Sequence, residues 1–92
     1  MKNTFIHQRR EEFIKFSGNP AYRDVFFDEL TGALRATHIE HHFDSEKGHY
    51  EEEVVAVLYK NGNKIILESE KNIEGIKTPD GTLNDLIFEI KQ

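Results

Sequence analysis

The stretch YEEEVVAVLYKNGNKIILE, residues 50–68, decides the fold of this 92-residue chain. Apolar residues recur at helical spacing in its first half, so we expect a helix over residues 50–61, ended by Gly62 in a left-handed conformation. The face expected to be buried consists of Tyr50, Val54, Val57 and Leu58, with Val55 at its flank. Residues 63–68 are rich in β-branched side chains and predict a strand.

On the amino-terminal side, residues 3–16 predict a helix that Gly18-Asn19-Pro20 ends. Residues 24–28 and 33–39 then predict a β-hairpin around a four-residue loop ending in glycine. On the carboxyl-terminal side, residues 73–77 predict a short strand. Gly81 predicts a turn and residues 83–91 a longer strand.

Together these elements predict an α+β fold: an N-terminal helix, a β-hairpin, and a central helix packed on a small, mainly antiparallel sheet. Ninety-two residues make one domain with a modest core. We expect residues 1–92 to form one domain, with residues 1–20 as an N-terminal helical extension.

Composition limits the class of protein. The absence of cysteine excludes disulfides and cysteine-based zinc sites, and agrees with a cytoplasmic location. There is no apolar run near the ~18 residues that a membrane span needs, so we expect no membrane partner. A net charge of −5 argues against strong non-specific binding of nucleic acid, which depends on Lys and Arg.

Residues 78–91 carry the pattern that indicates chemistry most directly. Asp80 stands at a strand entry, and Glu89 and Lys91 would share one face of the strand that follows. Nucleases of the PD-(D/E)xK type hold a divalent metal with such carboxylates and orient the attacking water with the lysine. We therefore expect Asp80 and Glu89 to bind Mg²⁺ or Mn²⁺ and Lys91 to be catalytic; the alternative is an ordinary turn followed by an amphipathic strand.

A cluster of histidines, and the glutamates at the start of the central helix, are further candidate site residues. Four histidines lie within twelve residues: His38, His41, His42 and His49. His38 and His42 are candidate acid and base residues for RNA cleavage, and the cluster could instead bind zinc or form a solvated loop without a role. Of the three glutamates that open the central helix, Glu51 is the candidate to join Asp80 and Glu89; the alternative is charge that complements the helix dipole.

Several short segments, taken together, resemble a known kind of domain. They are Ala36-Thr37-His38, His41-His42-Phe43-Asp44, Gly48-His49-Tyr50-Glu51, residues 54–58, Asn61-Gly62, Ile66 with Glu68, and Phe88-Glu89-Ile90-Lys91. The set resembles the small nuclease-like domains at the C-termini of contact-dependent inhibition toxins and of Mu-type phage minor head proteins, over roughly residues 24 to 91. The resemblance implies a nuclease of barnase or colicin type, or of PD-(D/E)xK type, acting on tRNA or DNA. The positions that it singles out are His38, His42, Tyr50, Glu51, Glu68, Asp80, Glu89 and Lys91.

This chain departs from the resemblance at its end, because such domains continue past the last strand with a further helix and strand. The expectation is therefore a metal-dependent nuclease, or a truncated remnant without activity. An uncapped sheet edge would also allow a homodimer. The alternative is a non-enzymatic binding module, or one associated with a phage capsid, that uses its sheet as an interaction platform.

Overall fold

The computed structural model describes residues 2–41, 48–69 and 80–88 of the chain. Two helices and five strands lie within these ranges, and the predicted α+β class, with its N-terminal helix, hairpin and central helix, is confirmed. The elements are α1 (Lys2–Ser17), β1 (Tyr22–Phe27), β2 (Leu34–His38), α2 (Gly48–Lys60), β3 (Lys64–Leu67), β4 (Gly81–Leu83) and β5 (Leu86–Phe88). The strand predicted over 73–77, and the part of the last strand beyond Phe88, lie outside the described residues.

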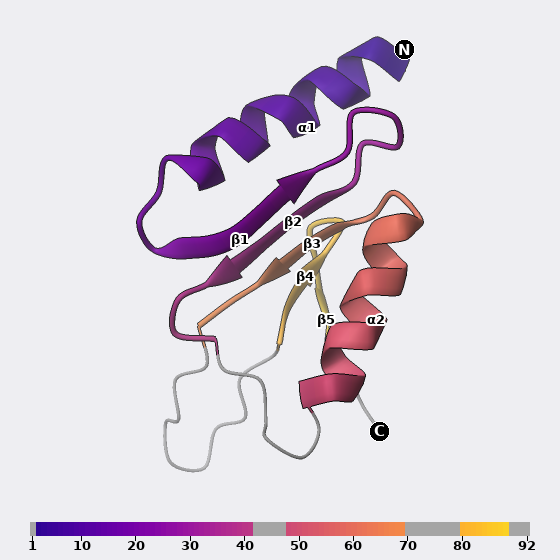
Figure 1. Ribbon diagram of the computed structural model, residues 1–92. Coiled ribbons are helices and arrows are strands. Elements are labelled where there is room, and N and C mark those ends of the chain that lie inside the picture. The colour runs from indigo at the N-terminus through magenta and orange to yellow at the C-terminus, as the bar shows by residue number, and fades with distance from the viewer. Residues whose placement is uncertain (1, 42–47, 70–79, 89–92) are drawn as a thin grey trace.

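The described strands form one mixed sheet in the order β1-β2-β3-β4-β5 (Figure 1). Three neighbouring pairs are antiparallel, and β2 and β3 are parallel. A parallel pair needs a crossover connection, and α2 lies in that connection. As a result, β2 and β3 finish on the same side of the sheet, and α2 also begins there (Figure 1). This side, where the carboxyl ends of the two strands lie, is the edge meant below for the site.

Two helices cover opposite faces of the sheet. Side chains alternate across a strand, so Ile65 and Ile66 of β3 point to opposite faces. Ile66 packs with Leu34 and Ala36 beneath aromatic residues of α1, whereas Ile65 packs with Leu67 and with Val55 of α2. All four residues of β3 are buried, which explains why its sequence does not alternate between apolar and polar residues.

The face of α2 that packs on the sheet is rotated from the predicted one. The buried side of the helix carries Val55, Leu58 and Tyr59, and Val55 has no exposed surface. Val57 is 57% exposed and Tyr50 41% exposed, so the prediction that they are buried was wrong. The buried face is shifted by one residue from the predicted one, and Glu51 also faces inward, where it meets the buried His41, an interaction that apolar spacing does not reveal.

The single strand predicted over residues 83–91 is also wrong, because a hairpin turn interrupts it. Asn84 and Asp85 separate β4 from β5 and have φ angles of 50° and 73°. Two consecutive left-handed residues are the requirement of a two-residue type I′ turn, and Asn and Asp tolerate that conformation. Gly81, expected in a turn, lies instead within β4.

A polar network around the buried Lys64 joins α1 to the sheet at the amino end of β3. The ammonium group of Lys64 contacts the carboxylates of Glu12 at 2.6 Å and Asp85 at 2.5 Å, although Lys64 is only 6% exposed. Burial acts to lower the pKa of Lys64, but the hydrogen bonds and charges of Asp85 and Glu12 outweigh it, and the pKa is raised. Beside this network, the buried Arg9 donates a hydrogen bond to the carbonyl of Gly32 at 2.9 Å.

Gly81 allows β4 to approach β3 closely, and we expect Gly81→Ala to destabilise the protein by about 1–3 kcal/mol or more. A Cβ atom at this position would overlap the backbone carbonyl oxygen of Ile66, which cannot move without disturbing the sheet. Urea denaturation would measure the change in the free energy of unfolding.

Gly18→Ala is the matched control. There, a Cβ would lie 3.5 Å from the nearest carbonyl oxygen, which is ordinary contact. Equal effects of the two substitutions would contradict the packing of β4 on β3.

Candidate functional site at the carboxyl ends of β2 and β3

Polar residues from five segments meet at the edge of the sheet where β2 and β3 end, at the bottom of Figure 1. Each is linked to another by a hydrogen bond or a ring contact. This group, the strand-end cluster, consists of Tyr22, His38, His41, Glu51, Glu68 and Asp80. His38 and Glu68 stand at or just beyond the ends of the parallel strands, and α2 brings Glu51 to the same edge.

His41 is the buried centre of the cluster. Its Nε2 atom lies 2.7 Å from Oε1 of Glu51, and its Nδ1 atom lies 2.9 Å from the backbone carbonyl oxygen of Glu68. The imidazole has no exposed surface and the Glu51 side chain is 12% exposed. His41 therefore fixes the orientation of Glu51 and is not itself open to a substrate.

The hydrogen bonds of His41 define where its protons lie. A carbonyl oxygen only accepts, so Nδ1 must carry a hydrogen. The short contact between Nε2 and Glu51 needs a second hydrogen, either on the imidazole or on the carboxyl group. These two contacts anchor α2 to the end of β3.

Glu68 joins the two sides of the cluster. Its backbone carbonyl accepts from His41, and its carboxylate accepts a hydrogen bond from the hydroxyl of Tyr22 at 3.1 and 3.3 Å to the two oxygens. Burial raises the pKa of Tyr22, and the charge and hydrogen bond of Glu68 raise it further. The phenol consequently stays protonated and holds the half-buried carboxylate in one orientation.

His38 offers a hydrogen-bond donor at the same edge. Its ring packs edge-on against the ring of Tyr22, with 5.3 Å between centroids. The backbone N–H of Glu40 donates to Nδ1 of His38 at 3.0 Å, so Nδ1 is an acceptor and Nε2 carries the hydrogen. A neutral imidazole fixed in this tautomer is a hydrogen-bond donor suited to an anionic oxygen.

Asp80 lies beside Glu68. The N–H of Glu68 donates to the carbonyl of Asp80 at 3.1 Å, and the N–H of Asp80 donates to the carbonyl of Phe88 at 3.2 Å. Asp80 of the carboxyl-terminal motif and the histidine segment, treated as alternative sites in the sequence, therefore lie at one edge. The other predicted site residues, His42, Glu89 and Lys91, lie outside the described residues.

Of the two predicted metal ligands, the structure describes Asp80. Carboxylate oxygens are the donors that Mg²⁺ and Mn²⁺ prefer, so the pair Asp80 and Glu89 suits either ion by chemistry. Among the residues that the structure describes, no three carboxylate or histidine side chains converge to hold a metal.

Tyr22 was not predicted as a site residue, and His41 was seen only as one histidine of a cluster. Tyr22 gave no sequence signal, because a tyrosine that opens a strand is ordinary. His41 had a weak signal in its proximity to His38, but spacing alone did not show which histidine would be buried.

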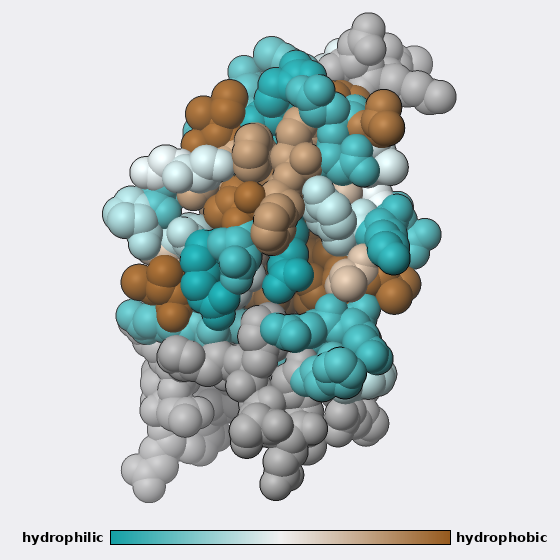
Figure 2. Space-filling view, viewed as in Figure 1, coloured by the Kyte–Doolittle hydropathy of each residue, from teal (hydrophilic) through white to brown (hydrophobic). Residues whose placement is uncertain are grey.

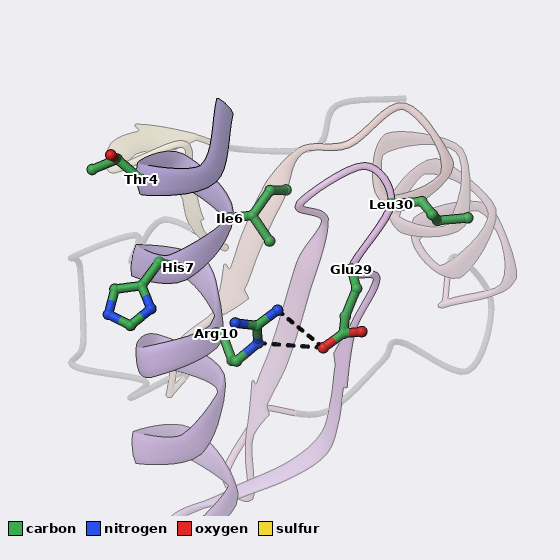
Figure 3. Close-up of a pocket in the computed structure, with 6 residues that line it drawn as sticks. All are labelled: Thr4, Ile6, His7, Arg10, Glu29 and Leu30. Atoms are coloured by element: carbon green, nitrogen blue, oxygen red, sulfur yellow. Dashed lines mark hydrogen bonds and ion pairs between the residues drawn. The ribbon is translucent and has the colours of Figure 1, made fainter. Parts of the chain in front are cut away.

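A separate open hollow lies at the other end of the sheet, between the first turns of α1 and the loop from β1 to β2 (Figure 3). Arg10 and Glu29 form an ion pair of 3.2 Å across it, while His7 points to the outer side of the helix (Figure 3). These two charges therefore offset each other in the hollow.

In Figure 2, hydrophobic residues adjoin one another across the upper middle of this face and are bordered by hydrophilic ones. Neither of the helices that the structure describes has the length and apolar character required to cross a membrane.

Comparison with protein-family models, with curated proteins and with solved structures found no match to this chain. The resemblance to toxin and phage nuclease-like domains therefore stays a prediction.

We expect Glu51→Ala to destabilise the protein by about 1–3 kcal/mol, because the buried His41 loses the partner of its Nε2 atom. Glu52→Ala is the matched control, since Glu52 is exposed in the same helical turn and its removal should change stability by less than about 0.5 kcal/mol. Thermal or urea denaturation measures both changes. Equal losses would show that the glutamates act only through the helix dipole.

Proposed function

We propose that the chain is a nuclease-like domain that cleaves phosphodiester bonds of RNA or DNA at the strand-end cluster. The supporting observation is that hydrogen bonds join the segments carrying His38, Glu51 and Asp80, predicted separately, where β2 and β3 end. Ligands commonly bind beyond the carboxyl ends of parallel strands, where the chain reverses direction and loops meet.

Glu68 and His38 are the residues proposed to act on the substrate. The carboxylate of Glu68, oriented by Tyr22, accepts the proton of the attacking hydroxyl group or water. The bond from phosphorus to the leaving oxygen breaks, and that oxygen takes a proton from water. The Nε2 hydrogen of His38 is placed to stabilise negative charge on a phosphate oxygen. His41 has a positioning role, because it is buried and holds Glu51.

The acidic character of the cluster must be offset for a phosphate to approach. Glu51, Glu68 and Asp80 all stand near the ends of β2 and β3, in a chain of net charge −5. A divalent cation at Asp80 and Glu89 would supply the positive charge that neutralises a bound phosphate. Lys91 and His42 remain proposed members of the same site.

The test is cleavage of fluorescently labelled tRNA, single-stranded RNA and duplex DNA, each with Mg²⁺, with Mn²⁺ and with a chelator. We expect Glu68→Gln and His38→Ala to reduce the cleavage rate by about 100-fold or more, since positioned acid–base and charge-stabilising groups contribute about that much. Loss of cleavage in chelator would identify the metal requirement.

His49→Ala and Glu52→Gln are matched controls for the same residue types. His49 is 87% exposed in its side chain and pairs with Glu53 in α2, away from the interactions that link the cluster. Absence of cleavage, or equal cleavage by all variants, would overturn the proposal.

A second function, a non-enzymatic binding module, is favoured by one observation. β5 is the last strand of the described sheet, and its Leu86 and Ile87 are 73% and 76% exposed. An edge strand offers unpaired backbone groups to another chain, including a second copy of this one. The sheet would then serve as the platform for self-association.

For this second function, we expect sedimentation at tens of micromolar to show a dimer that Ile87→Lys converts to monomer, because an edge lysine opposes strand pairing. Leu30→Lys is the control, since Leu30 is 94% exposed in the loop from β1 to β2. A wild-type protein that stays monomeric would exclude dimerisation through β5.

A further inference from the structure

The face of the sheet that carries α2 is only partly covered by that helix. α2 packs on β3, and its buried residues meet side chains of β3, β4 and β5. On β1, at the far side of the same face, Phe26 is 50% exposed and the Arg23 side chain is 42% exposed. The described part of the chain therefore leaves an aromatic ring on an open sheet surface.

Strand register places two arginines around this ring. Phe26 is directly opposite Arg35, and Arg23 is directly opposite Thr37. Opposed residues share a face, and Arg35 and Thr37 are two residues apart on one strand, so all four side chains lie on one side of the sheet. That side is the α2 side, because Arg35 and Thr37 are also paired with Ile65 and Leu67.

Arg35 is held beside Phe26 with part of its hydrogen-bonding capacity unused. Its Nε atom is buried and has no partner among the described residues. A guanidinium group is a planar donor that pairs with phosphate and stacks on aromatic faces, whereas an unpaired buried donor is costly. Because the Nε atom is closed to a ligand, a phosphate would pair with the terminal nitrogens of this half-buried side chain.

Arg23 connects this open face to the strand-end cluster. One of its nitrogens donates to the carbonyl oxygen of His41 at 3.1 Å, and another pairs with Asp24 at 2.5 Å. Thr37 lies about 7 Å along β2 from Arg35, toward the end where the cluster begins. A chain that lies along β1 and β2 on this face is therefore directed toward Glu51 and His41, whereas Tyr22 and His38 stand at the same strand ends on the α1 side of the sheet.

We infer that Phe26 and Arg35 form a binding surface for single-stranded nucleic acid, with a base stacked on Phe26 and a phosphate paired with Arg35. The inference rests on the proposed function and specifies its substrate as a single strand. Duplexes are disfavoured because their bases are already stacked and cannot lie on an exposed ring. The positive charge of Arg35 gives this face a local attraction that the net charge of −5 does not supply.

The test measures binding separately from cleavage, by fluorescence anisotropy of a labelled 12-nucleotide single-stranded RNA, with Glu68→Gln as the background. We expect Phe26→Ala to weaken binding at least about fivefold, as loss of one stacking aromatic commonly does. Arg35→Gln should weaken it similarly and lower the slope of log K against log salt by about one. Phe26→Tyr, which keeps the aromatic face, should bind within about twofold of the background.

Matched controls are Arg10→Gln and Leu30→Ala, an exposed arginine and an exposed apolar residue at the other end of the sheet. Thermal melts establish that each variant is folded. The inference is overturned if the background protein does not bind the RNA, or if Phe26→Ala binds it as tightly as the background does. Duplex binding as tight as single-strand binding also overturns it. A dimer that Phe26→Ala disrupts, without any change in RNA binding, also overturns it.

The two proposals fail in different ways. Intact binding at Phe26 and Arg35 with no cleavage by the wild-type chain supports this surface while it refutes the nuclease. The same labelled DNA strand, compared with the RNA, shows which nucleic acid is preferred.

Discussion

Burial of β3 on both of its faces is the constraint on which the rest of the structure depends. Its four residues are all buried, with Ile66 turned to α1 and Ile65 and Leu67 turned to α2. A strand in that position needs partners on both sides and a helix over each face. β2 and β4 supply the partners, and the crossover that makes β2 parallel to β3 places α2 on the second face.

Each end of β3 carries a polar residue whose burial requires specific partners. Lys64 at the start meets Glu12 and Asp85, and the carbonyl of Glu68 beyond the end meets His41, which in turn meets Glu51. Removing one member of such a buried pair is costly even where the pair adds little net stability. These contacts attach α1, the β4–β5 turn and α2 to one strand, and so fix how the helices are oriented on the sheet.

The same constraint creates the candidate site. Because β2 and β3 are parallel, their ends bring His38 and Glu68 to one edge, and the crossover begins α2 there with Glu51. α2 must cover β3, so it does not cover β1, and Phe26 and Arg35 lie on an open surface that leads to that edge. The proposed catalytic and binding surfaces are both consequences of where one helix packs.

Local pattern was enough to predict the helices, the first hairpin and the central strand, because each depends on residues adjacent in the chain. It was not enough for the face of α2 or for the second hairpin. The sequence does not show whether Glu51 is solvated or faces inward. Only the structure shows that the buried His41 contacts it. The Asn84-Asp85 turn was hidden by the apolar residues on either side, which extend the appearance of one strand.

By itself, the sequence determined the order of the elements and named His38, Glu51 and Asp80 as candidates. Only the tertiary structure decided that these residues belong to one edge, that Tyr22 and His41 join them, and that His41 is closed to solvent. The reason is physical: helix and strand periodicities act over a few residues. Contacts such as that of Tyr22 with Glu68 span forty-six residues and exist only once the sheet has formed.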